Sequence, residues 1–242
     1  MVSAIIVAAG SSRRMGFDKL FTPLAGKPVL WHSLTAFDEC KEVDEILVVT
    51  REERMDEVEQ LVSGEKLAKV KKVISGGAER HLSVWNGLQS VDSEGCEFVA
   101  IHDGARPLTT PALIRACLAL AREHGAACCA SQIPDTVKRA SAEQMVTESV
   151  ERTGLWAMQT PQIFSSGLIL QAYAALMAKH ELVTDEVSAV QKMGKKIALL
   201  KNDDWNFKIT FPHDLALAEQ VLALRAGKKP KTKKAKARPI SA

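Results

Sequence analysis

Short apolar runs alternate with longer amphipathic runs along most of the chain. The apolar runs are typical of buried strands, and they predict strands at residues 3–7, 46–49, 70–74, 97–101 and 126–130. The stretches between them have helical periodicity and predict helices at residues 29–37, 54–61, 82–91 and 111–124. This alternation predicts an α/β fold in which helices cover both faces of a mainly parallel sheet.

The alternation stops at a polar segment in the second half of the chain. Residues 135–139 and 145–152 read as two polar strands joined by a turn, so we expect a protruding β-hairpin arm at about residues 135–160. The arm has too little apolar surface for a core of its own, so it either lies over the active site or reaches onto another subunit. After the arm, the pattern predicts helices at residues 168–179, 185–193 and 214–224, and a strand at residues 196–201.

This order of elements predicts one Rossmann-like domain over residues 1–227, with the loops after its strands gathered at one sheet edge, where ligands bind. Residues 228–242 are rich in Lys, lack apolar periodicity and are expected to form a disordered basic tail. The tail carries a charge of +7, whereas the whole chain carries +3, so the remainder is −4. We therefore favour a solubilising tail over nucleic-acid binding, which would call for a basic face on the fold itself.

The composition, with 46% hydrophobic and 25% charged residues, is that of an ordinary soluble globular protein. No apolar run is long enough to span a membrane, and no signal peptide is visible, so we expect a cytoplasmic protein with no membrane contact. The five cysteines are odd in number and lack Cys-x-x-Cys spacing, which favours buried reduced thiols over disulfides or a zinc site.

Candidate chemistry begins in the loop after the first strand. Ala8, Ala9 and Gly10 leave backbone amides open to a ligand, and Arg13, Arg14 and Lys19 follow within a few residues. Exposed amides with fixed positive charge suit a polyphosphate. The loop is neither a Walker A motif nor Gly-x-Gly-x-x-Gly. On position alone, the two arginines could also be solvated loop charges.

Further motifs follow in a fixed order. They are Gly76-Gly77-Ala78-Glu79-Arg80 with Ser83, Ile101-His102-Asp103-Gly104-Ala105-Arg106-Pro107, Pro134-Asp135-Thr136-Val137-Lys138 with Arg152, Gln159-Thr160-Pro161-Gln162, Thr184-Asp185-Glu186, and Asn206-Phe207-Lys208-Ile209-Thr210. Together with the first loop, they resemble the 2-C-methyl-D-erythritol 4-phosphate cytidylyltransferase family over roughly residues 3–224. The resemblance implies transfer of a cytidylyl group from CTP to methylerythritol phosphate, with release of pyrophosphate, in non-mevalonate isoprenoid biosynthesis.

The resemblance also implies residue roles on the CTP side. Catalytic roles at the α-phosphate fall to Arg14 and Lys19, and the sequence leaves open whether Arg13 or Arg14 points inward. CTP-binding roles fall to Ala8, Ala9, Gly10, Arg13, Gly76 and Ser83. Mg2+ is implied as a cofactor bound mainly through the CTP phosphates, and no protein metal ligand is identified.

On the acceptor side, the resemblance implies that the phosphate and hydroxyl groups of methylerythritol phosphate are held by Asp103, Arg106, Thr136, Arg152, Thr184 and Lys208. In the family, the arm crosses to the partner subunit, so a homodimer with arm exchange is implied. Because a phosphate attacks and no proton has to be removed, we expect His102 to be structural or hydrogen-bonding rather than a general base.

Two departures from the family stand out. Gly104 replaces the more usual Ala, and the segment between Met15 and Lys19 is about two residues shorter than in many members of the family, which bears on how far Lys19 reaches. The competing hypotheses are a cytidylyltransferase for ribitol or ribulose 5-phosphate, a nucleic-acid binder acting through the tail, and a non-catalytic nucleotide sensor.

Overall fold

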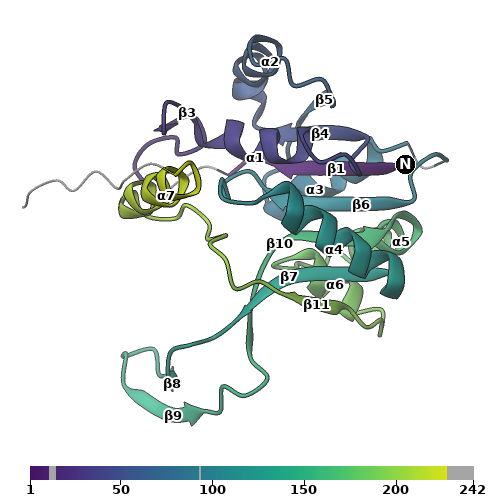
Figure 1. The fold of residues 1–242 in the computed structure, drawn as a ribbon. Helices are drawn as coiled ribbons and strands as arrows, with labels where there is room; N and C mark the ends of the chain where they lie inside the picture. Colours follow the sequence, from purple (N-terminus) through teal and green to yellow (C-terminus); the bar gives the residue numbers. More distant parts are fainter. Residues whose placement is uncertain (11–14, 93, 228–242) are drawn as a thin grey trace, which may run out of the picture.

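A seven-stranded sheet runs through the computed structural model, which describes residues 1–10, 15–92 and 94–227 (Figure 1). In spatial order, its strands are β11 (Ala198–Lys201), β7 (Ala126–Gln132), β10 (Trp156–Ser165), β6 (Phe98–Asp103), β1 (Val2–Val7), β4 (Glu45–Thr50) and β5 (Val70–Ser75). All neighbouring pairs are parallel except those of β10, which is antiparallel to both β6 and β7. The predicted α/β fold with a mainly parallel sheet is confirmed.

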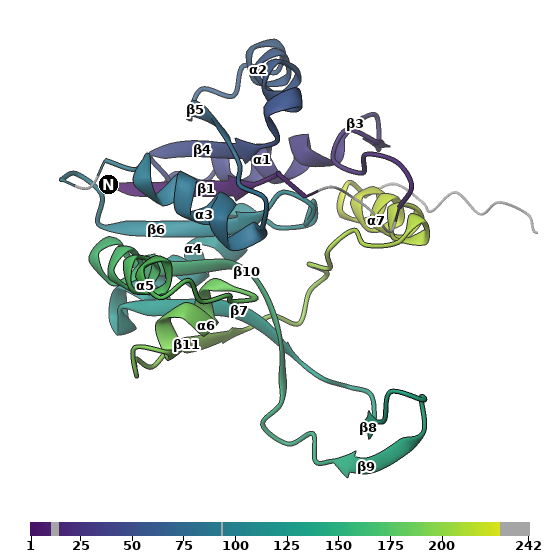
Figure 2. The same cartoon turned by 180° about the vertical axis from the view of Figure 1, so that it is seen from behind.

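Helices cover both faces of this sheet. Figure 1 shows α1 (Val29–Asp38) and α4 (Pro111–His124) on one face. On the opposite face, Figure 2 shows α3 (Arg80–Gln89), α5 (Ser166–Ala178) and α6 (Glu186–Gln191). Two more helices lie at the margins, α2 (Met55–Gly64) beside β5 and α7 (Pro212–Arg225) beside the small hairpin of β2 (Pro23–Leu24) and β3 (Lys27–Pro28).

The central strands are apolar on both faces because each face is buried. In β1, Ala4 and Ile6 belong to the core cluster under α1 and α4, whereas Ile5 belongs to the cluster under α3 and α5. All three side chains are fully buried. A near-continuous apolar run is therefore what a strand at this position requires.

Local signals fix the ends of α4. The Thr110 side chain accepts a hydrogen bond from the Leu113 amide at 3.2 Å, and Pro111 occupies the first turn. At the other end, Gly125 adopts a left-handed conformation with φ of 80°, which suits glycine. These caps position β7, which begins at the next residue.

The predicted arm is a two-stranded antiparallel hairpin, β8 (Val137–Ala140) with β9 (Val146–Val150). It projects away from the sheet and its covering helices (Figures 1 and 2). At its tip, Met145 and Val146 are 68% and 67% exposed. An extended hairpin with apolar side chains in solvent has the character of an interaction element.

The sequence patterns did not predict β10. They assigned residues 156–160 to the arm, but these residues form the first half of β10, and residues 156–158 pair with β7. Pro161 concealed the strand, because proline cannot donate to a ladder in the middle of a sheet. The structure accommodates it where the β10–β7 register shifts, between Met158 and Gln162.

The five cysteines are all buried free thiols, as predicted. Within the described ranges, no helix is both long enough and apolar enough to cross a membrane. The tail predicted at residues 228–242 lies outside the described residues.

Candidate functional site

Four parallel strands, β5, β4, β1 and β6, end at the same edge of the sheet and open into a cavity of about 600 Å³. Val7, Ala9 and Gly10 line it from the end of β1, and Asp103 lines it from the end of β6. Strand order alone brings these loops together, since the carboxyl ends of parallel neighbours share one edge. The edge predicted for ligand binding is thus the edge that carries the cavity.

The glycine loop after β5 packs against the loop after β1. The Gly76 amide donates to the Thr50 carbonyl at 2.7 Å. A Cβ added at Gly76 would lie 2.6 Å from Ala9 Cβ and 2.9 Å from Ser83 Oγ, closer than real contacts allow. Only glycine at position 76 lets the two loops pack this closely, and the packed loops form the floor of the cavity.

Ser83 orders the same loop. Its hydroxyl is buried and accepts a hydrogen bond from the Gly77 amide at 3.1 Å, and it can donate to the Glu79 carbonyl at 3.1 Å. Of the predicted CTP-binding residues that the structure describes, Ala9, Gly10 and Ser83 line the cavity, while Ala8 and Gly76 pack directly behind that lining.

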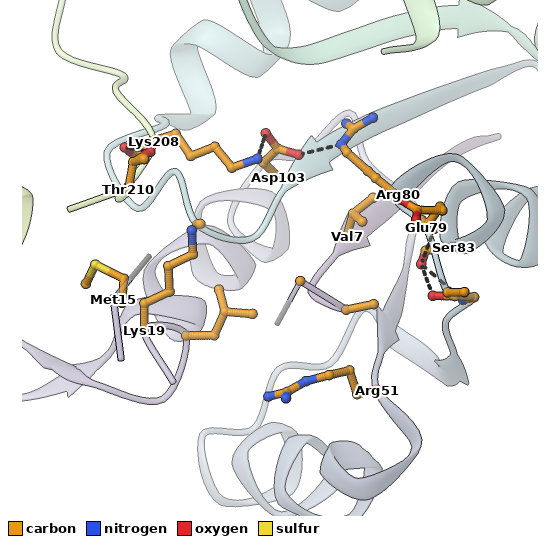
Figure 3. A pocket seen from close by; sticks show the side chains of 16 residues that line it. Val7, Met15, Lys19, Arg51, Glu79, Arg80, Ser83, Asp103, Lys208 and Thr210 are labelled. Atoms are coloured by element: carbon orange, nitrogen blue, oxygen red, sulfur yellow. Dashed lines mark hydrogen bonds and ion pairs between the residues drawn. The ribbon is translucent and has the colours of Figure 1, made fainter. Parts of the chain in front are cut away.

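Asp103 forms the most strongly charged contact in the cavity. Its carboxylate accepts from Arg80 Nε at 3.1 Å and from Lys208 Nζ at 2.9 Å, and Arg106 Nε lies 3.7 Å away. Burial alone would raise the pKa of the Asp103 carboxyl, but Arg80, Lys208 and Arg106 outweigh it and hold that pKa well below its usual range. The carboxylate is therefore ionised and surrounded by cations, as Figure 3 shows for Arg80 and Lys208.

Lys208 and Arg106 reach Asp103 from segments outside the sheet ladders. Lys208 lies between β11 and α7, in an extended segment that is not a strand. Arg106 lies in the turn after β6, donates to the Asn206 carbonyl at 2.8 Å and is not part of the cavity lining. The predicted acceptor residues Asp103, Arg106 and Lys208 are thus brought together.

Lys19 lines the same cavity despite its shortened loop. Its Nζ donates to the Ile209 carbonyl at 2.7 Å, next to Lys208 in sequence. Figure 3 shows the Lys19 side chain pointing toward the ion pair of Lys208 and Asp103. Arg13 and Arg14, the other predicted charges of this loop, lie outside the described residues.

The structure does not bring the other three predicted acceptor residues into this cavity. Thr136 and Arg152 are exposed at the base of the arm, and Thr184 is exposed just before α6. Arg152 lines a second cavity of about 880 Å³ at the arm's base, and it donates to the Pro134 carbonyl. The predicted acceptor residues of one chain are therefore divided among the cavity, the base of the arm and the segment before α6.

Two cavity residues escaped the sequence analysis, Arg80 and Arg51. Arg80 makes a two-pronged ion pair with Glu186, at 2.6 and 3.1 Å, in addition to its contact with Asp103. Glu186 is fully buried and also accepts from the Tyr173 hydroxyl at 3.1 Å. Arg80 stood inside a quoted motif, but its partner lies 106 residues away, so no local signal marked the pair.

His102 lies beside Asp103 and has no access to the cavity. Complete burial lowers the pKa of His102 to about 3. Its Nδ1 lies 3.0 Å from Thr160 Oγ1, and its Nε2 lies 3.3 Å from the Arg106 carbonyl oxygen. A neutral, enclosed imidazole with these partners has a hydrogen-bonding role, which agrees with the expectation that it is not a general base.

Carboxylates are sparse around the cavity. Asp103 and Glu79 are the two that line it, and the described residues contain no cluster of three or more His, Cys, Asp or Glu side chains that could hold a metal ion. The lining instead combines cations from Lys19, Arg51, Arg80 and Lys208 with the small residues Ala9, Gly10, Gly77 and Ala78. This set can bind and neutralise phosphates.

Comparison with known proteins supports this chemistry. The family model for 2-C-methyl-D-erythritol 4-phosphate cytidylyltransferase matches residues 2–224. Proteins of that name from Caldanaerobacter subterraneus and Lachnospira eligens are 43% and 40% identical to the chain, over 91% and 90% of it, and are covered to 98% and 97% of their own lengths.

Solved structures show the same similarity. The 4-diphosphocytidyl-2C-methyl-D-erythritol synthase of Anaerococcus prevotii superposes with a TM-score of 0.81 at 29% identity, covering 92% of this chain and 96% of that one. The 2-C-methyl-D-erythritol 4-phosphate cytidylyltransferase of Thermus thermophilus superposes with a TM-score of 0.73 at 29% identity, covering 92% and 98%.

Proposed function

Because the chain belongs to the 2-C-methyl-D-erythritol 4-phosphate cytidylyltransferase family, we propose that the cavity at the ends of β1, β4, β5 and β6 is its transfer site. The enzyme transfers a cytidylyl group from CTP to 2-C-methyl-D-erythritol 4-phosphate, giving 4-diphosphocytidyl-2-C-methyl-D-erythritol and pyrophosphate. The observation that carries the proposal is the meeting of Lys19, Lys208 and Asp103 beside a glycine-lined floor.

Charge repulsion is the main obstacle to this reaction. An oxygen of the acceptor phosphate forms a bond to the α-phosphorus of CTP, while the bond from that phosphorus to the bridging oxygen of the β-phosphate breaks and pyrophosphate leaves. Both reactants are anions, so catalysis requires neutralisation and alignment. Lys19, together with Arg14 or its neighbour Arg13, is the proposed source of positive charge at the α-phosphate.

The CTP half of the site comprises the loops after β1 and β5. Amides at Ala9 and Gly10 are proposed to hold the triphosphate and cytosine, while Gly76 and Ser83 shape the floor that receives the base. The Ala8 amide, which the sequence analysis also assigned to CTP, is not open to a ligand, because it donates to the Val49 carbonyl at 2.7 Å. Support comes from the close packing of Gly76 on Ala9, which leaves backbone rather than side chains at the surface.

The acceptor half is centred on Lys208 and Asp103. Lys208 is proposed to bind the phosphate of methylerythritol phosphate, and Asp103 to accept hydrogen bonds from hydroxyl groups while keeping Lys208 and Arg80 in place. Arg106 supports this carboxylate from behind. The three cations Arg80, Arg106 and Lys208 outnumber the two carboxylates that they face, Asp103 and Glu186, which leaves this part of the site suited to an anion.

Thr136, Arg152 and Thr184 are the remaining members of the proposed acceptor set. We propose a homodimer in which each arm delivers Thr136 and Arg152 to the cavity of the other subunit, next to Thr184. Support comes from the projection of the arm away from its own sheet and from its exposed apolar tip. In a two-fold dimer, both sites are completed by the same exchange.

A divalent cation, Mg2+, fits this lining if the CTP phosphates supply most of its ligands. Asp103 and Glu79 are the carboxylates within the cavity, and Mg2+ commonly binds through one or two carboxylates together with substrate phosphates and water. When bound, it would neutralise phosphate charge. The five free thiols further support the proposal that the enzyme works in the reducing cytoplasm.

Pyrophosphate release tests the proposal. With CTP, we expect turnover with methylerythritol phosphate and little with ribitol 5-phosphate. Lys19→Met should lower kcat by about 100-fold, the scale for removing one group that stabilises a developing charge, and change the KM for CTP much less. Lys27→Met is the matched control, because Lys27 pairs with Glu65 outside the cavity.

Either of two results would contradict the proposal. Turnover with ribitol 5-phosphate alone would reject the assigned acceptor. A Lys19→Met enzyme as fast as the Lys27→Met control would reject the role of Lys19.

A further inference from the structure

Asp18, the residue before Lys19, is held by two arginines from the end of β4. Its Oδ2 pairs with Arg51 Nη2 and lies 3.2 Å from Arg54 Nε. Its Oδ1 accepts from the Leu20 amide at 3.2 Å. The carboxylate therefore ties the Lys19 segment to the loop after β4, 33 residues away in sequence.

Both arginines are themselves fixed. Arg54 lies 5.1 Å from the centre of the Phe21 ring and pairs with Glu57. Arg51 lines the cavity, and its Nε is buried with no hydrogen-bond partner among the described residues. The Asp18 side chain is only 13% exposed, so solvent screens these pairs less than it would on an open surface.

The backbone around Lys19 is also restrained on its other side. The Thr22 hydroxyl donates to the Asp18 carbonyl at 2.9 Å, and Lys19 Nζ donates to the Ile209 carbonyl at 2.7 Å. Lys19 thus has its backbone anchored through Asp18 and its ammonium group directed into the cavity. This arrangement explains how a shortened loop brings the lysine into the site.

We infer that Asp18 and Arg51 form a positioning pair that holds Lys19 for phosphoryl chemistry. The inference rests on the proposed role of Lys19 at the α-phosphate. Displacement of a catalytic group by about 1 Å can cost as much as 100-fold in rate, so loss of the anchor lowers kcat without removing a substrate contact. Arg54 supports the pair through the same carboxylate oxygen, Asp18 Oδ2.

Steady-state kinetics of Asp18→Asn and Arg51→Gln test the inference. Asn keeps an acceptor for the Leu20 amide but loses the charge that holds the arginines. We expect each variant to lower kcat about tenfold, with the KM for CTP within about twofold. Arg51→Lys should recover part of the rate, because a lysine can still pair with Asp18.

The double variant provides the decisive comparison. If the two residues act as one unit, Asp18→Asn with Arg51→Gln loses no more than either single variant. The matched control is Glu53→Gln, which removes the exposed carboxylate 3.3 Å from Arg51 Nη1 and should leave kcat unchanged. Thermal unfolding of each variant identifies any loss of kcat that comes from loss of the fold. If Asp18→Asn does not fold, the comparison of kcat between Arg51→Lys and Arg51→Gln still tests the inference.

Each alternative has its own outcome. If Arg51→Gln raises the KM for CTP while Asp18→Asn retains full kcat, Arg51 binds the nucleotide directly and the inference is overturned. If Lys19→Met retains full rate, the proposed role of Lys19 fails instead. If the role of Lys19 and the positioning pair are both correct, adding Asp18→Asn to Lys19→Met causes no further loss of kcat.

Discussion

At the residue scale, two adjacent buried groups differ in charge, because His102 is neutral and Asp103 is ionised. His102 and Asp103 are both buried, but cations surround only the Asp103 carboxylate. The Arg106 carbonyl can only accept, so His102 Nε2 carries the proton and Nδ1 accepts from the Thr160 hydroxyl, which in turn accepts from the Asp103 amide at 3.1 Å. The neutral imidazole thereby fixes the turn that presents Asp103.

The pKa of His102 predicts a specific pH dependence of stability. That pKa is about 3 in the folded protein and about 6.5 in the unfolded chain, so between these values the unfolded chain binds more protons. The free energy of unfolding should therefore fall by up to about 1.4 kcal/mol per pH unit below 6.5 because of this residue, with no contribution above it. His102→Gln removes this slope.

Urea unfolding of wild type and His102→Gln at several pH values from 5 to 8, a range chosen to bracket about pH 6.5, checks this expectation. The stability difference between the two proteins should be constant in the upper part of the range and shrink in the lower part. A difference that stays constant throughout would show that His102 binds protons equally in the folded and unfolded states, which would contradict a lowered pKa in the folded protein.

At the element scale, the sequence predicted most of the sheet because its parallel strands are apolar on both faces. β1 and β4 could be found this way, since their apolar runs need no partner to be recognised. β10 could not, because Pro161 interrupts its pattern and only the register shift against β7 accommodates it.

The residues of the candidate site also differ in whether the sequence alone could identify them. Ser83 and Lys208 stand in motifs that resemble the family, so they could be named from sequence. Arg80 and Arg51 owe their places to Glu186 and Asp18, which lie far along the chain. Long-range ion pairs leave no periodicity or spacing by which a single sequence reveals them.

Two glycines that directly follow strands of the sheet, Gly76 after β5 and Gly104 after β6, give a matched pair of predictions. A Cβ at Gly76 meets Ala9 Cβ at 2.6 Å, where neither atom can move away alone, whereas a Cβ at Gly104 meets Leu30 Cδ1, the end of a flexible side chain, at 2.9 Å. Gly76→Ala should cost about 1–3 kcal/mol of folding free energy and weaken CTP binding, and Gly104→Ala less than about 1 kcal/mol.

Urea unfolding and CTP titration of both variants check the pair. Equal losses, or a larger loss for Gly104→Ala, would contradict the view that the floor of the cavity depends on the contact between Gly76 and Ala9.

At the scale of the whole molecule, one chain holds the proposed acceptor residues in separate places. The cavity of the sheet presents Lys208 and Asp103, while Thr136 and Arg152 are exposed at the base of the arm and do not line that cavity. The proposed exchange of arms in a two-fold dimer accounts for both observations, and it makes activity a property of the pair of subunits.

Activity of a heterodimer built from two inactive variants tests this account most directly. One subunit carries Lys19→Met and the other carries Arg152→Met, each with a different affinity tag, and the doubly tagged dimer is purified. With composite sites, one site receives both substitutions and the other receives neither, so the heterodimer should regain about half of the wild-type kcat per dimer. If each site were built from one chain, both sites would be defective, and a heterodimer as inactive as the two parent homodimers would contradict the account.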